Sequence, residues 1–217
     1  VYFAYGNFFY VQADYKRAED YYSISLDIAR KNNGDSLRGI IEIRRSFIEF
    51  ELGNWEKAES MFEGVLYEAE KSSDTVTIIG ALNGLAQVKE KQSRRDETMK
   101  HYIRALSLAE KSNRKNEMAY VLNNLGLLKL NTGQMEEAKK DLLLATQLAI
   151  EAGNERIVAN AYLNIGLIYD ETGQKDSALY FYKYFLASEK KTGEPRSIAT
   201  GYVNLTSAYY DRKDYVT

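Results

Sequence analysis

Residues 161–182 read AYLNIGLIYDETGQKDSALYFY, and forty positions earlier residues 121–142 read VLNNLGLLKLNTGQMEEAKKDL. Each stretch contains Asn, a branched apolar residue and Gly, then Thr-Gly-Gln, then Ala, in the same order and at the same spacing. A motif that returns at a fixed distance of about 20 to 50 residues is the mark of a repeat architecture. The fold therefore depends on whether this motif continues on both sides.

The repeat continues along the whole chain in two columns of equivalent positions. One column holds small residues: Ala18, Ala58, Thr98, Ala138 and Ala178. The other column is aromatic or leucine: Tyr22, Phe62, Tyr102, Leu142 and Tyr182. Both columns keep a period of 40 residues without an insertion, and the length of 217 is five times 40 plus 17. The sequence therefore predicts five repeat units and part of a sixth.

Each unit has the pattern of two helices. In the last complete unit, apolar residues recur at intervals of three and four from Ile157 to Glu171, which is the helical period. Gly173 interrupts this pattern, and a second one runs from Ala178 to Leu186 and stops before Pro195. Strand-like alternation is missing from the sequence, so we predict an all-α chain of helical hairpins.

Small residues at two further columns explain how the helices approach and end. A mid-helix glycine costs about 1 kcal/mol relative to alanine, which is tolerated where a neighbouring helix must come close. This column comprises Gly6, Ser46, Ala86, Gly126 and Gly166. Between units the sequence places residues that tolerate positive φ. They are Asn33, Ser73, Asn113, Gly153 and Gly193.

The motif of these hairpins resembles a known signature. Tyr162-x-x-Ile165-Gly166-x-x-Tyr169 followed by Ala178-x-x-x-Tyr182 is similar to the tetratricopeptide repeat pattern W-x-x-L-G-x-x-Y…A-x-x-x-F. The resemblance implies a right-handed superhelical solenoid of antiparallel helix hairpins. Because the period is 40 residues and the family's usual period is about 34, we identify a long-period variant. It resembles the arrays of peptide-sensing bacterial regulators and of scaffold proteins of the kinesin light chain type.

On this basis we expect one solenoid domain over residues 1–217. Its repeats are predicted at 1–35, 36–75, 76–115, 116–155 and 156–195, with a partial repeat at 196–217. Both ends cut a repeat, so we expect a fragment of a longer protein. One unit departs from the pattern, because Glu42, Arg45 and Glu49 replace apolar residues of the first helix. We expect that helix to pack through Ile43, Phe47 and Phe50 instead.

The composition narrows the function classes. With 29 basic and 31 acidic residues the formal net charge is −2, which does not favour nucleic acid or an anionic membrane as partner. The sequence has no Cys and one His, so thiolate and multi-His metal sites are excluded. It contains no apolar run of about 18 residues that could span a membrane. We find no catalytic motif and expect neither an enzyme nor a cofactor. The compartment stays open, with a small preference for the cytoplasm.

The resemblance points to recognition of a protein or peptide. In this family the first helices line a concave face, and the residue before the Leu-Gly pair points into it. That column ends in three asparagines, whose amides both donate and accept hydrogen bonds and could bind a peptide backbone. With neighbouring columns, the candidate binding residues are Arg44, Asn83, Asn123, Asn124, Leu127, Asn160, Asn164, Leu167 and Asn204.

Two readings of this asparagine ladder remain open. The amides either bind a ligand or connect neighbouring repeats through hydrogen bonds. For the chain as a whole, we expect a non-catalytic scaffold that binds an extended peptide or a partner helix. The alternative is a sensory or regulatory segment of a bacterial signalling protein, such as a transcription regulator or a histidine kinase, that responds to a peptide or a partner. The oligomeric state is open.

Overall fold

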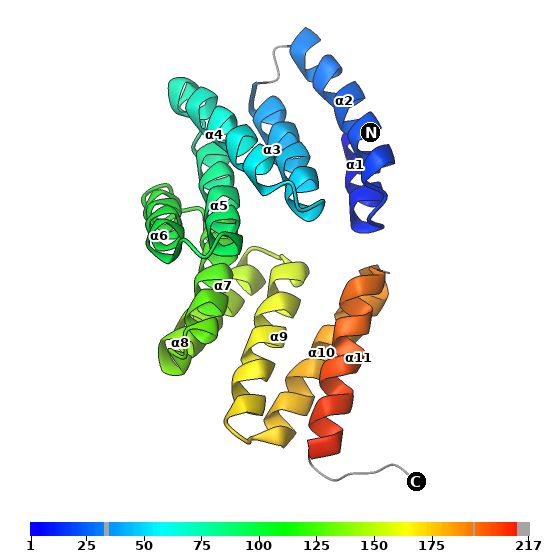
Figure 1. The fold of residues 1–217 in the computed structure, drawn as a ribbon, viewed down its shortest axis with the longest axis vertical. Helices are drawn as coiled ribbons and strands as arrows, with labels where there is room; N and C mark the ends of the chain where they lie inside the picture. The colour runs from blue at the N-terminus through cyan, green and yellow to red at the C-terminus, as the bar shows by residue number, and fades with distance from the viewer. Residues whose placement is uncertain (33–34, 193, 212–217) are drawn as a thin grey trace. The chain divides into compact units, whose positions relative to one another are not determined.

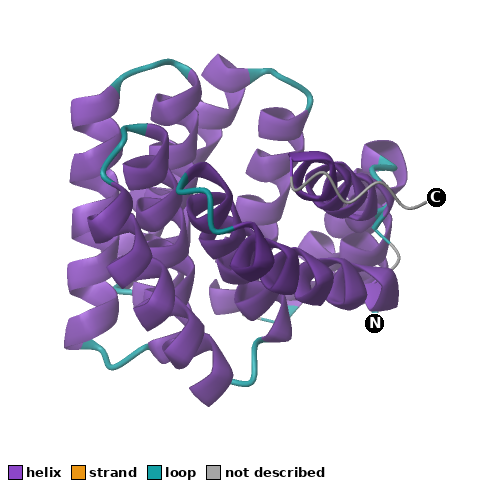
Figure 2. Ribbon diagram, turned by 90° about the horizontal axis from the view of Figure 1, so that it is seen from below, coloured by secondary structure: helices purple, strands orange, loops and turns teal. Residues whose placement is uncertain are grey.

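The computed structural model describes residues 1–32, 35–192 and 194–211, and every regular element in these ranges is an α-helix (Figure 2). The first helices of the successive hairpins are α1 (Tyr2–Val11), α3 (Asp35–Glu51), α5 (Thr75–Lys91), α7 (Lys115–Asn131), α9 (Glu155–Glu171) and α11 (Pro195–Asp211). The second helices are α2 (Tyr15–Lys31), α4 (Trp55–Ser72), α6 (Arg95–Lys111), α8 (Met135–Glu151) and α10 (Lys175–Thr192). The predicted all-α fold of helical hairpins is confirmed.

The turns occupy the predicted positions. Positive φ recurs at the tip of each hairpin, at Ala13, Gly53, Ser93, Gly133 and Gly173. It recurs between hairpins at Ser73, Asn113 and Gly153, whereas Asn33 and Gly193 lie outside the described residues. Ala13 and Ser93 adopt the left-handed conformation with φ of 56° and 61° although glycine holds this column elsewhere. The repeat geometry therefore imposes this conformation even on residues with a Cβ.

Within a hairpin, the mid-helix glycine receives the aromatic or leucine column of the second helix. A Cβ on Gly6 would lie 2.5 Å from the ring of Tyr22, and a Cβ on Gly166 would lie 2.6 Å from the ring of Tyr182. Tyr22 and Tyr182 are fully buried, as is the whole small-residue column of the second helices. The predicted close approach of the two helices is confirmed.

The chain consists of two compact units, Val1–Glu117 and Met118–Thr217. Helices α1 to α6 form unit 1, and consecutive helices lie side by side in it (Figure 1). Unit 2 contains α8 to α11 and most of α7, and α9 packs between α8 and α10.

Helix α3, whose sequence departs from the apolar pattern of the repeat, packs as predicted. Ile43 and Phe47 are buried with Phe62 of α4, and Phe50 packs against the same cluster. Arg45, one of the polar residues that replace apolar ones in this helix, forms two ion pairs. Arg45 donates to Glu19 of α2 at 2.6 Å and to Glu42 at 3.1 Å.

At three places, one pair of columns connects a second helix to the first helix of the next hairpin. In unit 1, the buried ammonium of Lys89 on α5 pairs with Glu59 on α4. In unit 2, the Lys139 ammonium on α8 lies 4.4 Å from the ring centre of Tyr169 on α9. Between α10 and α11, the equivalent positions are Leu179 and Tyr209, which pack in one apolar cluster. The same junction is thus made by three different kinds of contact.

Candidate functional site

The asparagines of α7 and α9 form a hydrogen-bonded relay in unit 2. The amide nitrogen of Asn164 donates to the side-chain oxygen of Asn123 at 3.1 Å. The amide nitrogen of Asn123 in turn donates to the side-chain oxygen of Asn124 at 3.3 Å. Asn164 and Asn123 are 5% and 6% exposed, so this bond between neighbouring first helices is shielded from water. The structure therefore contains the repeat-bridging contact that was one of the two readings.

The candidate residues of unit 2 other than the buried Asn123 and Asn164 have partly accessible side chains. Asn124, Leu127, Asn160, Leu167 and Asn204 are all half-buried and come from α7, α9 and α11. Leu167 also packs against the buried residues of both neighbouring hairpins. These side chains thus combine amides and leucines on three successive first helices, partly in the core and partly accessible.

Two predicted residues lie in unit 1 and are described separately. Asn83 on α5 is fully buried. Arg44 on α3 is half-buried, and its Nε lies below the surface with no hydrogen-bond partner in the described part of unit 1. The same holds for Nε2 of Gln87 on α5.

A polar cluster fixes the turn end of the hairpin α9–α10. Lys175 donates to Asp170 at 2.6 Å and to Asp211 of α11 at 2.8 Å. The hydroxyl of Tyr182 donates to Asp170 at 3.4 Å, and burial together with that carboxylate raises the pKa of Tyr182. Both carboxylate oxygens of Asp170 therefore accept hydrogen bonds from the following helix, from Lys175 and from Tyr182.

The single histidine of the sequence, His101, lies on α6. Burial and the nearby Lys89 lower the pKa of His101 from its ordinary value. Within the described residues, no three His, Cys, Asp or Glu side chains are grouped so that they could hold a metal ion. A search of the same residues finds no helix with the length and apolarity needed to cross a membrane.

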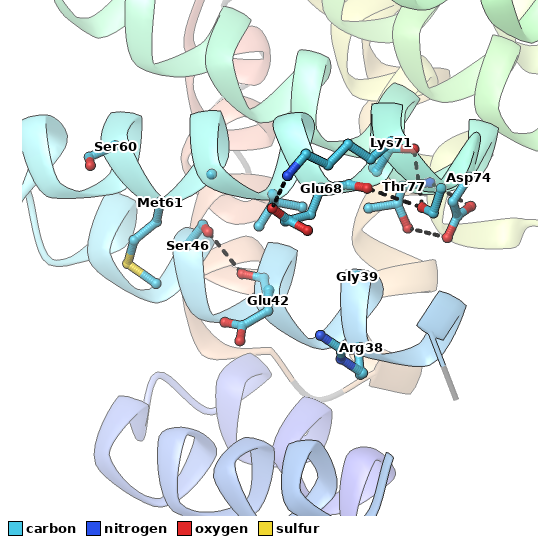
Figure 3. Close-up of a pocket in the computed structure, with 14 residues that line it drawn as sticks. Arg38, Gly39, Glu42, Ser46, Ser60, Met61, Glu68, Lys71, Asp74 and Thr77 are labelled. Carbon is cyan, nitrogen blue, oxygen red and sulfur yellow. Dashed lines mark hydrogen bonds and ion pairs between the residues drawn. The ribbon is translucent and has the colours of Figure 1, made fainter. Parts of the chain in front are cut away.

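A cavity between α3 and α4 was not anticipated from the sequence. It has a volume of about 570 Å³, and residues from α3 and α4 form its walls while Asp74 and Thr77 close one end (Figure 3). Glu42 and Ser46 line it on α3, and Met61 and Glu68 line it on α4. One sign of this cavity is visible in the sequence, where the polar residue Glu42 replaces an apolar residue of the repeat.

Comparison with known proteins places the hairpins among the helical solenoid repeats. The family model of the tetratricopeptide repeat matches residues 117–183. Residues 117–183 are thus similar to the tetratricopeptide repeat, and the 40-residue period of the sequence continues on both sides of them. A search of curated protein sequences gives no match.

Solved structures share this fold along nearly the whole chain. BtubC (BKLC) from P. vanneervenii is 21% identical with a TM-score of 0.70, over 89% of this chain and 82% of BtubC. Aspartyl phosphate phosphatase F from Bacillus subtilis is 15% identical with a TM-score of 0.68, over 99% of this chain and 65% of that protein. A putative kinesin light chain of Podosopora anserina with TPR-like repeats is 16% identical with a TM-score of 0.59, over 80% of this chain and 86% of that one. At these identities the likeness establishes the fold.

Proposed function

We propose that the chain is a non-catalytic protein-binding scaffold whose first-helix face in unit 2 binds an extended peptide or a partner helix. The half-buried side chains Asn124, Leu127, Asn160, Leu167 and Asn204 would form the contact surface. Leucines supply apolar contact area there, and amides can pair with the donors and acceptors of a peptide backbone. A groove of this composition selects by shape and hydrogen bonding, in keeping with a formal net charge of −2.

The observation that carries this proposal is the asparagine relay. The bond from Asn164 to Asn123 and the bond from Asn123 to Asn124 fix the orientation of two amides behind the accessible surface. An amide has two N–H donors and an oxygen with two lone pairs, so two bonds do not exhaust three amides. Side chains that are already oriented lose little entropy when a ligand binds. The relay would thus serve both readings, since it bridges two repeats and orients the binding amides.

The test separates the accessible end of the relay from its buried end. A peptide selected from a display library on the 217-residue chain is titrated by calorimetry against Asn124→Ala and Asn164→Ala. For Asn124→Ala we expect about tenfold weaker binding and a smaller fall in Tm than for Asn164→Ala, because Asn123 loses an acceptor at a half-buried position. For Asn164→Ala we expect a lower Tm as well, because Asn123 loses a buried donor. Selected peptides that bind Asn124→Ala and Leu127→Ala as tightly as the unaltered chain would contradict the proposal.

A regulatory segment is the second candidate, and one comparison favours it. The chain covers 65% of aspartyl phosphate phosphatase F, so a third of that protein has no counterpart here. In this alternative the repeats bind a peptide or partner and act on a separate output domain. The coding sequence on both sides of the segment distinguishes the two candidates, because a DNA-binding or kinase domain would support regulation and further repeats would support the scaffold.

A further inference from the structure

Gly64 in the middle of α4 is unlike the other glycines that the structure describes. Each of those either has positive φ in a turn or faces a neighbouring side chain that a Cβ would strike. Gly64 has neither property, because nothing lies within 4 Å of the position its Cβ would occupy. Glycine in a helix interior costs about 1 kcal/mol relative to alanine. Nothing within the described chain accounts for this cost at Gly64.

The repeat itself shows that its fold does not require glycine at this position. In the other hairpins the equivalent residues are all larger: Ile24, Arg104, Leu144 and Tyr184. On the facing first helix, Glu42 likewise replaces the apolar residues Leu82, Leu122 and Tyr162. In the hairpin α9–α10 these two columns are filled by Tyr162 and Tyr184, whose ring centres are 4.6 Å apart. In the hairpin α3–α4 the same columns hold Glu42 and Gly64, and both residues line the 570 Å³ cavity.

Two independent departures from the repeat therefore open one cavity. Its volume is within the range of about 300 to 1,000 Å³ that is usual for ligand pockets. Met61 and Val65 supply an apolar wall beside Gly64. Methionine adapts its shape to different neighbours, and a glycine lets another chain approach the helix backbone closely. These features suit a long side chain that enters from outside.

The charges around the cavity favour a cation. Helix α4 contains five glutamates and two lysines, a net charge of −3. Glu63, adjacent to Gly64, is exposed, and no ion pair is found for it in the described residues. Glu42 and Glu19 share the guanidinium of Arg45, and Glu42 and Asp27 share that of Arg30, at 4.0 and 3.8 Å. Three carboxylates thus face two guanidinium groups, which leaves one negative charge in excess.

The two cations in the cavity lining are Arg38 and Lys71. Lys71 is paired with Glu68 at 3.3 Å, and both side chains are more than half exposed. An exposed pair of this kind contributes little to stability, so a second cation could share or replace it at small cost.

We propose that this cavity binds a lysine or arginine side chain from a basic segment of a partner protein, which lies across Gly64. The aliphatic part of that side chain packs against Met61 and Val65, and its charged end reaches the carboxylates of Glu42 and Glu68. This site lies in unit 1 and does not depend on the peptide face proposed for unit 2.

The experiment measures fluorescence anisotropy with two labelled synthetic amphipathic peptides of about three helical turns. Both peptides have the same leucines, and the polar positions are lysine in one and glutamate in the other. We expect the lysine peptide to bind and the glutamate peptide not to bind. Gly64→Leu places in the cavity the residue found at Leu144 and should weaken binding about tenfold without lowering Tm. Glu42→Gln should weaken binding severalfold.

The matched control is Glu56→Gln, which removes an acid from the first turn of α4 outside the cavity lining. It should change the affinity less than twofold, as expected for general electrostatic attraction at an exposed site. Equal affinity of the lysine peptide for Gly64→Leu and the unaltered chain would overturn the proposal. Preference for the glutamate peptide, absence of binding by the lysine peptide, or equal effects of Glu56→Gln and Glu42→Gln would overturn it as well.

Discussion

The hairpins α3–α4 and α9–α10 have the same backbone arrangement, but they differ between their two helices at one pair of equivalent positions. Aromatic rings fill that place in α9–α10, and a cavity takes their place in α3–α4. In α9–α10, the rings of Tyr162 and Tyr184 meet, and Phe181 contacts Tyr162 at 5.1 Å between ring centres. In α3–α4, the equivalent residues Glu42 and Gly64 leave a cavity. The backbone of the repeat is held by its buried columns, which both hairpins keep. The positions outside those columns are therefore free to differ, and they can be filled within the chain or left for a partner.

The largest expected effect comes from transferring the α3–α4 pair into α9–α10. Tyr162→Glu with Tyr184→Gly removes the contact between a half-buried and an exposed aromatic ring and adds a helix-interior glycine. We therefore expect the free energy of unfolding to fall by about 3 kcal/mol. Urea denaturation measures it. Tyr180→Gly, at a more exposed ring of the same helix, is the control and should cost about 1 kcal/mol. If the double variant costs no more than this control, the aromatic pair does not stabilise the hairpin.

Substitution of two glycines should have smaller effects, and the change in stability should have opposite signs at the two positions. Gly166→Ala places a Cβ 2.6 Å from the buried Tyr182 ring, so we expect a loss of about 1 to 3 kcal/mol. Gly64→Ala meets open space and should raise the stability by about 1 kcal/mol. Thermal and urea unfolding of the two variants check this. A loss of stability in Gly64→Ala would show that this glycine has a structural role.

The smallest expected effect is a difference in acid sensitivity between the two units. Hydrogen bonds from the Arg17 backbone and from Arg94 lower the pKa values of Asp14 and Glu97 respectively. Burial raises the pKa values of Glu49 and Glu59, but hydrogen bonds from their Lys partners outweigh it, and both pKa values fall below 4.5. All four carboxyl groups lie in unit 1.

A lowered folded-state pKa gives stability that is complete above the ordinary value and is lost as the pH falls through the folded-state value. Below pH 4.5, unit 1 should therefore loosen before unit 2. Trp55, the single tryptophan, lies on α4 and reports on unit 1, whereas circular dichroism reports on all helices. We expect the Trp55 fluorescence to change at a higher pH than the helix signal. Coincident transitions would contradict this prediction.

The sequence alone predicted what the repeat preserves. The helix expected over Ile157–Glu171 begins two residues earlier, at Glu155, and ends at the predicted residue. The columns were sufficient here because each of them is required by packing in every hairpin. Gly64 was missed for the opposite reason, since its significance lies in differing from Ile24, Leu144 and the rest of its column.

The candidate binding face was predicted less completely. Columns group residues exactly one period apart, but the buried hydrogen bond joins Asn164 to Asn123, which are 41 residues apart. Neighbouring helices offer each other adjacent columns, so equivalence in sequence does not identify partners in space. Of the predicted residues, Arg44 and Asn83 belong to unit 1, and the others belong to unit 2. Whether the face binds a ligand remains a prediction.

The three junction contacts have a consequence for the order of the hairpins. Lys89 with Glu59, Lys139 with Tyr169, and Leu179 with Tyr209 occupy the same two columns but are not interchangeable. A hairpin moved to another place in the array would keep its 40-residue spacing and its small-residue columns. Its junction side chains, however, would face residues of a different polarity or charge. A buried charge such as Lys89 without its carboxylate is costly. The junction contacts therefore encode the order of the hairpins, and an array assembled in another order would be less stable at its junctions.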